Sequence, residues 1–179
     1  WHGKGRNRYV ITPRFAISCP AGQLIAAGRL HEQYPDTYIQ THLSENKDEI
    51  DSTLSLFPDC RDYLEVYERA GLVTDRSVFG HCIHLSDSEC RRLAESGSVV
   101  AHCPTSNLFL GSGLFDMQQA NRIGMQTVLA TDVGSGTTFS LLRTMGESYK
   151  VQHLNGYPMS VCESLYKCTL GAAKALHLD

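Results

Sequence analysis

Two kinds of hydrophobic pattern alternate along the chain. Runs rich in β-branched and aromatic residues predict five strands, at residues 9–12, 37–42, 77–81, 98–102 and 126–131. Hydrophobic positions three or four residues apart predict helices between and after the strands, at about residues 24–30, 47–56, 62–70, 86–96, 117–123 and 142–149, with a last helix in the alanine-rich tail. Two Ser-x-x-Glu sequences predict helix starts through capping boxes, at Ser86 and Ser160. The polar segment 104–107 predicts a loop, and residues 133–136 predict a glycine-rich turn.

The succession of strands and helices indicates an α/β fold with a mainly parallel sheet. A polar side chain follows or ends each predicted strand: Arg14, His42, His81, His102 and Asp132. A parallel barrel gathers catalytic groups at these ends of its strands, whereas an open doubly wound sheet does so only near a switch point. A complete barrel takes about 250 residues. We therefore expect residues 1–179 to form a single domain that is part of a (β/α)8 TIM-type barrel, roughly strands four to eight with their helices.

Composition and charge exclude several classes of protein. Of the 179 residues, 42% are hydrophobic and 20% are charged, which fits an ordinary globular domain. A net charge of −3 gives no basic surface for nucleic acid, and no apolar run reaches the ~20 residues of a membrane helix. The cysteines number seven and lack C-x-x-C spacing. This usage favours buried, reduced thiols and a cytoplasmic location.

The segment from His42 to Glu45 offers two groups suited to metal chemistry. An imidazole at the end of a strand can bind Zn²⁺ or Fe²⁺. A carboxylate three residues later can lean over the same site and move protons between water and substrate. The structural alternative is an exposed histidine followed by a glutamate that stabilises a helix N-terminus.

His81 and Asp132 end two further strands. His81 is either a ligand or a hydrogen-bonded core residue; His84 lies past the strand end and is set aside. A carboxylate after an apolar strand is costly to bury without a cation or donors, so Asp132 is either a ligand or a cap of the following turn. Together with His42, these residues offer two nitrogens and one oxygen, which suit Zn²⁺ or Fe²⁺. The set is incomplete as a zinc site if one of the three residues orients the water instead, because catalytic zinc normally has at least three protein ligands plus water.

Four segments together resemble the guanine deaminases of the amidohydrolase superfamily. They are ITPRF at 11–15, QTHLSEN at 40–46, HCPTSN at 102–107 and ATDVG at 130–134. The similarity extends over nearly the whole chain. The Thr-Pro-Arg-Phe element and the stretch 104–115 are typical of guanine deaminases rather than of the superfamily at large.

The resemblance implies a barrel enzyme that uses Zn²⁺, or alternatively Fe²⁺, to hydrolyse guanine to xanthine and ammonia. His42 and Asp132 would bind the metal, and Asp132 would also take a proton from the attacking water. His81 would hold the water or the substrate and touch the metal. Glu45 would pass protons to a ring nitrogen and to the leaving amine.

The resemblance also implies how the substrate is held. Arg14 and Phe15 would contact the purine, and His42, Glu45 and Asp132 would line the same pocket. The full-length protein would be a homodimer with guanine as its ligand, without nucleic-acid or membrane partners.

Two features of the family have no counterpart in this sequence. Guanine deaminases place a His-x-His pair on the first barrel strand, where both histidines bind the metal, and they build a small β-domain around the barrel. No His-x-His pair occurs among the 179 residues. We therefore expect the N-terminal part of the enzyme to lie upstream of Trp1, and the isolated chain to be inactive.

Two rival functions stay open. A sister amidohydrolase would act on another aminated or chlorinated heterocycle, although the Arg14–Phe15 pair argues for a purine. A non-catalytic fragment or binding module would keep the barrel surface alone, although the presence of Glu45 and Asp132 argues for chemistry.

Overall fold

A five-stranded parallel sheet forms the centre of the protein. The computed structural model describes residues 1–178. The spatial order of the strands follows the chain, and every neighbouring pair is parallel, which confirms the expected α/β architecture. The strands are β1 (Val10–Ile11), β2 (Tyr38–Leu43), β3 (Ser77–His81), β4 (Val99–His102) and β5 (Gln126–Leu129).

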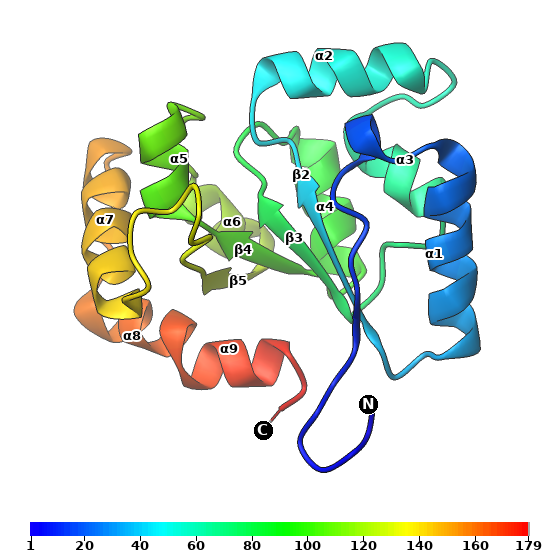
Figure 1. The fold of residues 1–179 in the computed structure, drawn as a ribbon. Coiled ribbons are helices and arrows are strands. Elements are labelled where there is room, and N and C mark those ends of the chain that lie inside the picture. The colour runs from blue at the N-terminus through cyan, green and yellow to red at the C-terminus, as the bar shows by residue number, and fades with distance from the viewer. Residues whose placement is uncertain (179) are drawn as a thin grey trace.

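Helices connect the strands and surround the sheet (Figure 1). In Figure 1, β2 points toward α2, whereas α9 lies toward the opposite end of the sheet. The helical elements are the 3-10 turn η1 (Ala16–Ser18), α1 (Ala21–Gln33), α2 (Lys47–Leu56), α3 (Tyr63–Arg69), α4 (Asp87–Glu95), α5 (Pro104–Leu110), α6 (Met117–Ile123), α7 (Leu141–Leu154), α8 (Val161–Cys168) and α9 (Leu170–Ala175).

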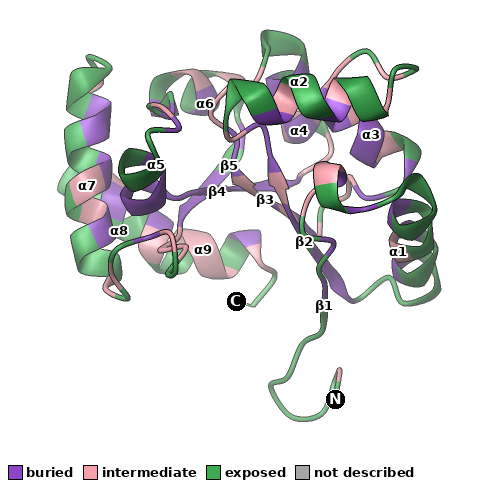
Figure 2. Cartoon of the chain, turned by 45° about the horizontal axis from the view of Figure 1, so that its top comes forward, coloured by how far each residue is buried: buried purple, intermediate pink, exposed green. Residues whose placement is uncertain are grey.

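The two faces of the sheet contribute to two separate hydrophobic cores. Phe79 and Val100 belong to the larger core, which also takes buried residues from α1, α3, α4 and α6. Val99 and Val128 belong to the smaller core, together with Ala175 of α9. Successive residues of a strand point to opposite faces, which explains why Val99 and Val100 lie in different cores. Figure 2 shows that the strands are mostly buried and that the helices around them are exposed on their outer surfaces.

The segment after β4 is a helix, so the prediction of a loop at residues 104–107 was wrong. Pro104 occupies the first turn of α5, where its fixed φ is favourable and its missing N–H costs nothing. Gly111 ends the helix in the left-handed conformation with a φ of 71°. The polar residues Thr105, Ser106 and Asn107 misled the prediction because they are buried here rather than exposed.

The predicted helix starts are confirmed at Ser86 and Ser160. At α4 the capping box is complete: the Ser86 hydroxyl accepts from the backbone N–H of Glu89, and the Glu89 carboxylate accepts from the backbone N–H of Ser86. At α8 only the serine half forms. The carboxylate of Glu163 instead accepts a hydrogen bond from the Tyr157 hydroxyl at 2.8 Å.

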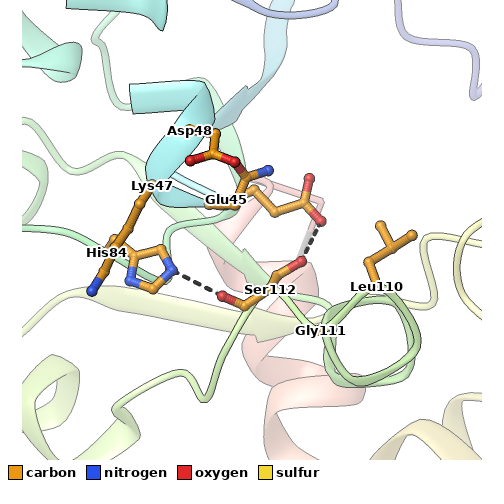
Figure 3. Close-up of a pocket in the computed structure, with 8 residues that line it drawn as sticks. Glu45, Lys47, Asp48, His84, Leu110, Gly111 and Ser112 are labelled. Carbon is orange, nitrogen blue, oxygen red and sulfur yellow. Dashed lines mark hydrogen bonds between the residues drawn. The ribbon is translucent and has the colours of Figure 1, made fainter. Parts of the chain in front are cut away.

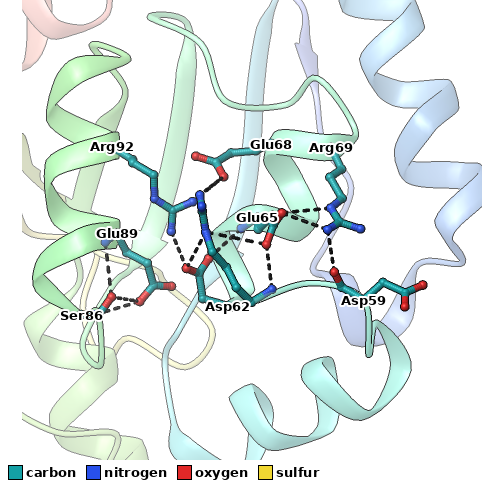
Figure 4. Close-up of polar contacts among 9 residues, drawn as sticks. Asp59, Asp62, Glu65, Glu68, Arg69, Ser86, Glu89 and Arg92 are labelled. Atoms are coloured by element: carbon teal, nitrogen blue, oxygen red, sulfur yellow. Dashed lines mark hydrogen bonds and ion pairs between the residues drawn. The ribbon is translucent and has the colours of Figure 1, made fainter.

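A network of ion pairs joins α3 to α4 (Figure 4). Arg92 of α4 contacts Glu68 and places Nη2 2.5 Å from a carboxylate oxygen of Asp62. Asp62 also caps α3 by accepting the backbone N–H of Glu65. The Arg92 side chain is only 16% exposed, so these contacts lie in a partly buried setting where charge pairing matters more than at the open surface.

The structure also describes the length of the helices and the state of the cysteines. No helix within residues 1–178 is long and apolar enough to cross a membrane. All seven cysteines are free thiols. Four of them are buried as predicted, whereas Cys162 is exposed on α8 and Cys60 and Cys168 are half-buried.

Candidate active site at the carboxyl ends of the strands

His42 lies near the carboxyl end of β2, where the backbone of the preceding segment fixes its ring. Ring Nδ1 lies 2.7 Å from the carbonyl oxygen of Arg14. Because a carbonyl oxygen can only accept, Nδ1 carries the proton and Nε2 keeps its lone pair. The ring also stacks on that of His81, with centroids 5.1 Å apart.

His81 ends β3 and is held in the same way by a side chain of α5. It is 2% exposed, and its Nδ1 lies 2.8 Å from Oδ1 of Asn107. With Nδ1 donating to this oxygen, Nε2 is free on the opposite side of the ring. Nε2 faces Asp132, whose Oδ2 lies 4.0 Å away.

Glu45 reaches the same place from the loop between β2 and α2. Its Oε1 lies 3.6 Å from Nδ1 of His81 and accepts a hydrogen bond from the Ser112 hydroxyl at 2.9 Å. Its backbone N–H donates to the buried carboxylate of Glu49 at 2.9 Å. Both the main chain and the carboxylate of Glu45 are therefore held in place.

Asp132 follows β5 by three residues and keeps a third of its side chain exposed. Within residues 1–178 its carboxylate makes no hydrogen bond to the following turn, so it is not the turn cap considered as an alternative. The turn depends on Gly136, because a Cβ at that position would lie 1.8 Å from the carbonyl oxygen of Thr131. The close turn leaves the carboxylate directed toward His81.

Backbone strain gathers at this end of the sheet. Ser44, His81, Cys82 and Asp132 have φ values between 45° and 70°, in the left-handed region that favours glycine. Each such residue costs about 1–3 kcal/mol, and such residues cluster at active sites and ligand clamps. Two of the four are candidate site residues, and Ser44 directly precedes a third, Glu45.

Arg14 and Phe15 form an arm beside His42. The Arg14 guanidinium lies 5.0 Å from the centre of the Phe15 ring, and the Phe15 and His42 ring centres are 5.5 Å apart. Arg14 is exposed and Phe15 is half-buried. The arm therefore presents donors and an aromatic edge next to the imidazole.

A cleft of about 630 Å³ opens beside Glu45 (Figure 3). Ser112 lies on its wall and faces both Glu45 and His84 in Figure 3. The ring of His84, which the sequence argument set aside, places Nε2 2.8 Å from the Ser112 carbonyl oxygen. His84 thus supports the wall of the cleft rather than the group around His81.

His102 ends β4 but points away from this group into the helical layer. It is fully buried, and its ring stacks on Phe115 at 4.9 Å. Burial, with smaller electrostatic contributions from the nearby His81 and Lys167, lowers the pKa of His102 to about 3. It is therefore a neutral packing residue, unlike the other polar residues at the strand ends.

The donor chemistry of the site fits a divalent metal, although the set within this chain is small. Within residues 1–178, no group of three or more His, Cys, Asp or Glu side chains could hold a metal ion. His42 and His81 nevertheless each direct Nδ1–H to an oxygen acceptor and keep Nε2 free. A hydrogen bond from the ring nitrogen that faces away from the metal is typical of metal-binding histidines. A carboxylate, Asp132, faces one of the two free nitrogens.

Sequence reasoning missed three residues that touch the site. Asn107 holds His81, Ser112 holds the Glu45 carboxylate, and Glu49 holds the Glu45 main chain. The first two lie in the stretch 104–115, which was noted for its resemblance and, at residues 104–107, as a predicted loop. Glu49 was detectable as the third residue of α2 after Asn46, because this pair forms a complete capping box.

Comparison with known proteins defines the class of protein. The sequence pattern of the Amidohydrolase family matches residues 1–179. Guanine deaminase of Escherichia coli (strain K12) is 51% identical over 179 residues, which cover 100% of this chain and 41% of that protein. The chain belongs to the amidohydrolase family and spans less than half the length of the curated relatives it matches first.

Solved structures share the fold. The E. coli guanine deaminase structure superposes with a TM-score of 0.98 over 100% of this chain and 42% of that chain. Guanine deaminase from C. acetobutylicum, with guanine bound in its active site, has a TM-score of 0.86 at 32% identity, over 92% of this chain and 41% of its own. An adenosine deaminase from Xanthomonas campestris with bound zinc shares the fold at 23% identity, with a TM-score of 0.85 over 93% and 38%. The expected partial TIM-type barrel is confirmed.

Proposed function

We propose that the full-length protein is a metal-dependent guanine deaminase and that residues 1–179 form the C-terminal part of its barrel. The observation that carries this proposal is the meeting of the Arg14–Phe15 arm, His42, Glu45 and His81 at one end of the sheet. All 179 residues of this chain align with a guanine deaminase at 51% identity, over 41% of that protein.

The proposed metal ligands are His42, His81 and Asp132, with further ligands supplied by the rest of the protein. Imidazole and carboxylate donors suit Zn²⁺ and also accept Fe²⁺. A divalent metal, when bound, supplies Lewis acidity and lowers the pKa of the water that attacks the substrate.

Two carboxylates would divide the proton transfers. Water attacks the purine carbon that carries the amine, and Asp132 takes a proton from this water. Glu45 carries the two protons of the water, one to the ring nitrogen and, once Asp132 gives up the proton it took, one to the departing amine. The C–N bond then breaks as ammonia leaves, and the water oxygen stays on the carbon as the carbonyl of xanthine. Ser112 favours this role because its hydroxyl fixes one oxygen of the Glu45 carboxylate.

The Arg14–Phe15 arm would hold the purine beside His42, Glu45 and Asp132. The guanidinium offers a planar fork of donors to a purine oxygen or nitrogen, and Phe15 offers ring contact. Since the carbonyl of Arg14 bonds the ring of His42, movement of the arm would also move a proposed metal ligand. We further propose that the full-length protein is a cytoplasmic homodimer, as the resemblance to guanine deaminases implies, with no nucleic-acid or membrane partner.

Steady-state assays of the full-length protein test the proposal. Guanine should release xanthine and ammonia, with kcat/KM at least roughly 100-fold above that for adenine, cytosine or a triazine. The purified protein should contain stoichiometric zinc or iron, and chelation should abolish turnover until metal is restored. Preference for a triazine would identify a sister amidohydrolase, and a metal-free protein without turnover would identify a binding module.

A further inference from the structure

Two stacked tyrosines of α3 lie directly behind the candidate site. Tyr63 and Tyr67 are each at most 1% exposed, and their ring centres are 5.5 Å apart. Burial raises the pKa of both hydroxyls above the ordinary value of 10.0, so both stay protonated and can donate. A buried hydroxyl is costly unless it is hydrogen-bonded, and the partners of these two are informative.

The Tyr67 hydroxyl joins the end of β2 to the turn that follows the Arg14–Phe15 arm. It donates to the carbonyl oxygen of His42 at 2.8 Å. It accepts the backbone N–H of Ala16 and the hydroxyl of Thr41, both at 3.0 Å. One hydroxyl therefore fixes the main chain of a proposed metal ligand and the main chain next to Phe15.

The Tyr63 hydroxyl acts on Glu45 through one intermediate residue. It donates to Oε1 of Glu49 at 2.8 Å. It also accepts the backbone N–H of Ala16, but at 3.3 Å, a longer contact than the 3.0 Å to the Tyr67 hydroxyl. The other oxygen of this carboxylate accepts the backbone N–H of Glu45 at 2.9 Å. Glu49 is 6% exposed, so its carboxylate depends on these donors and on the backbone N–H of Asn46 for compensation.

We propose that Tyr67 and Tyr63 are positioning residues with different main tasks: Tyr67 holds the Arg14–Phe15 arm against His42, and Tyr63, through Glu49, holds Glu45. The inference rests on the proposed function and deepens it. Phenylalanine would fill the same volume in the core, so packing does not require the hydroxyls. The Tyr67 hydroxyl reaches main-chain atoms of His42 and Ala16. The Tyr63 hydroxyl reaches the carboxylate that holds the main chain of Glu45.

The separate tasks predict a separation of kinetic effects. Tyr67→Phe loosens the arm that would bind the purine, so KM for guanine should rise about 3- to 10-fold with a smaller change in kcat. Tyr63→Phe loosens the proton-transferring group, so kcat should fall by a similar factor while KM changes little. Thr41→Val removes a hydroxyl that contacts both the Tyr67 hydroxyl at 3.0 Å and the Arg14 carbonyl oxygen at 3.2 Å, so it should raise KM in the same direction as Tyr67→Phe.

The experiment measures these variants in the metal-loaded, full-length protein beside the matched control Tyr157→Phe. The Tyr157 hydroxyl also donates to a glutamate, Glu163, at 2.8 Å, but on α8 and away from the site. Tyr157→Phe should lower the thermal stability, as Tyr67→Phe and Tyr63→Phe should, but leave kcat and KM unchanged. Values of kcat and KM within two-fold of wild type for both Tyr67→Phe and Tyr63→Phe would overturn the inference.

Hydrogen exchange separates failure of the inference from failure of the proposed function. Tyr67→Phe should speed amide exchange in the peptide containing Ala16, and Tyr63→Phe in the peptide containing Glu45, whichever substrate the enzyme uses. If the wild-type protein fails to deaminate guanine but these local effects occur, the positioning roles stand and the substrate assignment falls. Unchanged exchange at both peptides overturns the positioning roles.

Discussion

The carbonyl oxygen of Arg14 accepts two hydrogen bonds from His42, one from the backbone N–H at 3.1 Å and one from ring Nδ1 at 2.7 Å. A residue proposed to hold the purine and a residue proposed to hold the metal are thus parts of one hydrogen-bonded unit. The bonds use the main chain of Arg14, which leaves its guanidinium available for substrate. The two roles of this position can therefore be separated by mutation.

Arg14→Lys should weaken guanine binding while leaving the metal site intact. Lysine keeps the charge but loses the planar fork of donors, so KM should rise roughly 10-fold or more, as for the loss of a charge-assisted hydrogen bond. Metal content should stay at the wild-type level, because the carbonyl that holds His42 remains. Arg29→Lys on the exposed side of α1 is the matched control. Loss of metal in Arg14→Lys would contradict the separation.

Glu45→Gln should abolish most of the activity without unfolding the protein. Glutamine can still accept the Ser112 hydroxyl, but it cannot carry the proton, so kcat should fall about 100- to 10,000-fold. Glu32→Gln, an exposed substitution of the same kind on α1, should leave kcat unchanged. A Glu45→Gln variant with more than a tenth of wild-type kcat would remove Glu45 from the proton-transfer role.

Asn107→Leu should lower the affinity for the metal strongly and change the thermal stability little. The Asn107 carbonyl oxygen is the acceptor for Nδ1 of His81, whereas its buried Nδ2 has no partner within residues 1–178. Leucine frees the His81 ring and also removes an unsatisfied donor. Metal affinity should fall about 10- to 100-fold, as is usual when support of a metal-binding histidine is lost; titration of the apoprotein measures this.

The control for that experiment should show the opposite pattern. The Asn155 side-chain amide donates to the Phe115 carbonyl at 2.9 Å, far from His81 in the chain. Asn155→Leu should therefore reduce thermal stability and leave metal affinity unchanged. Equal metal affinities for Asn107→Leu and the wild type would show that His81 needs no support or binds no metal.

The sheet was predictable from the sequence because its signals are local. β-branched residues between helical patterns identify each strand. A parallel sheet must bring the carboxyl ends of its strands, where His42, His81 and Asp132 lie, to one side. The first residues of α4 and α8 were predictable for the same reason, since Ser86 and Ser160 cap these helices through the backbone N–H three residues later. These features need no knowledge of distant contacts.

The remaining parts of the site arise from long-range contacts and were not predictable in this way. Ser112 meets Glu45 across 67 positions of the chain, and Asn107 meets His81 across 26. The polar residues of α5 suggested a loop because burial of their side chains depends on tertiary packing. His102 shows the converse: it occupies a strand end like His81, yet its ring points into the helical layer.

Arg92→Met should destabilise the protein by about 2 kcal/mol, because the partly buried Asp62 and Glu68 lose their close contacts to Arg92 and keep the longer contacts to the exposed Arg61. Arg91, the preceding residue, is 67% exposed and lies 3.9 Å from Asp87. Arg91→Met should therefore change the free energy of unfolding by less than about 1 kcal/mol. Urea unfolding of the two variants makes the comparison. Equal effects would mean that the α3–α4 network contributes no more than a surface pair.

His102 should make the protein lose stability in mild acid. Its pKa of about 3 in the folded state lies below the ordinary 6.5, so between these pH values the unfolded chain binds more protons than the folded one. The contribution is absent above pH 6.5, and as the pH falls below that value the free energy of unfolding decreases by about 1.4 kcal/mol per pH unit. His102→Gln removes the titrating group, so its melting temperature should fall less steeply from pH 6.5 to 4 than that of the wild type. His153→Gln, at an exposed position on α7, should keep the wild-type slope. Parallel slopes for all three proteins would show that His102 is protonated equally in the folded and unfolded states, in conflict with its complete burial.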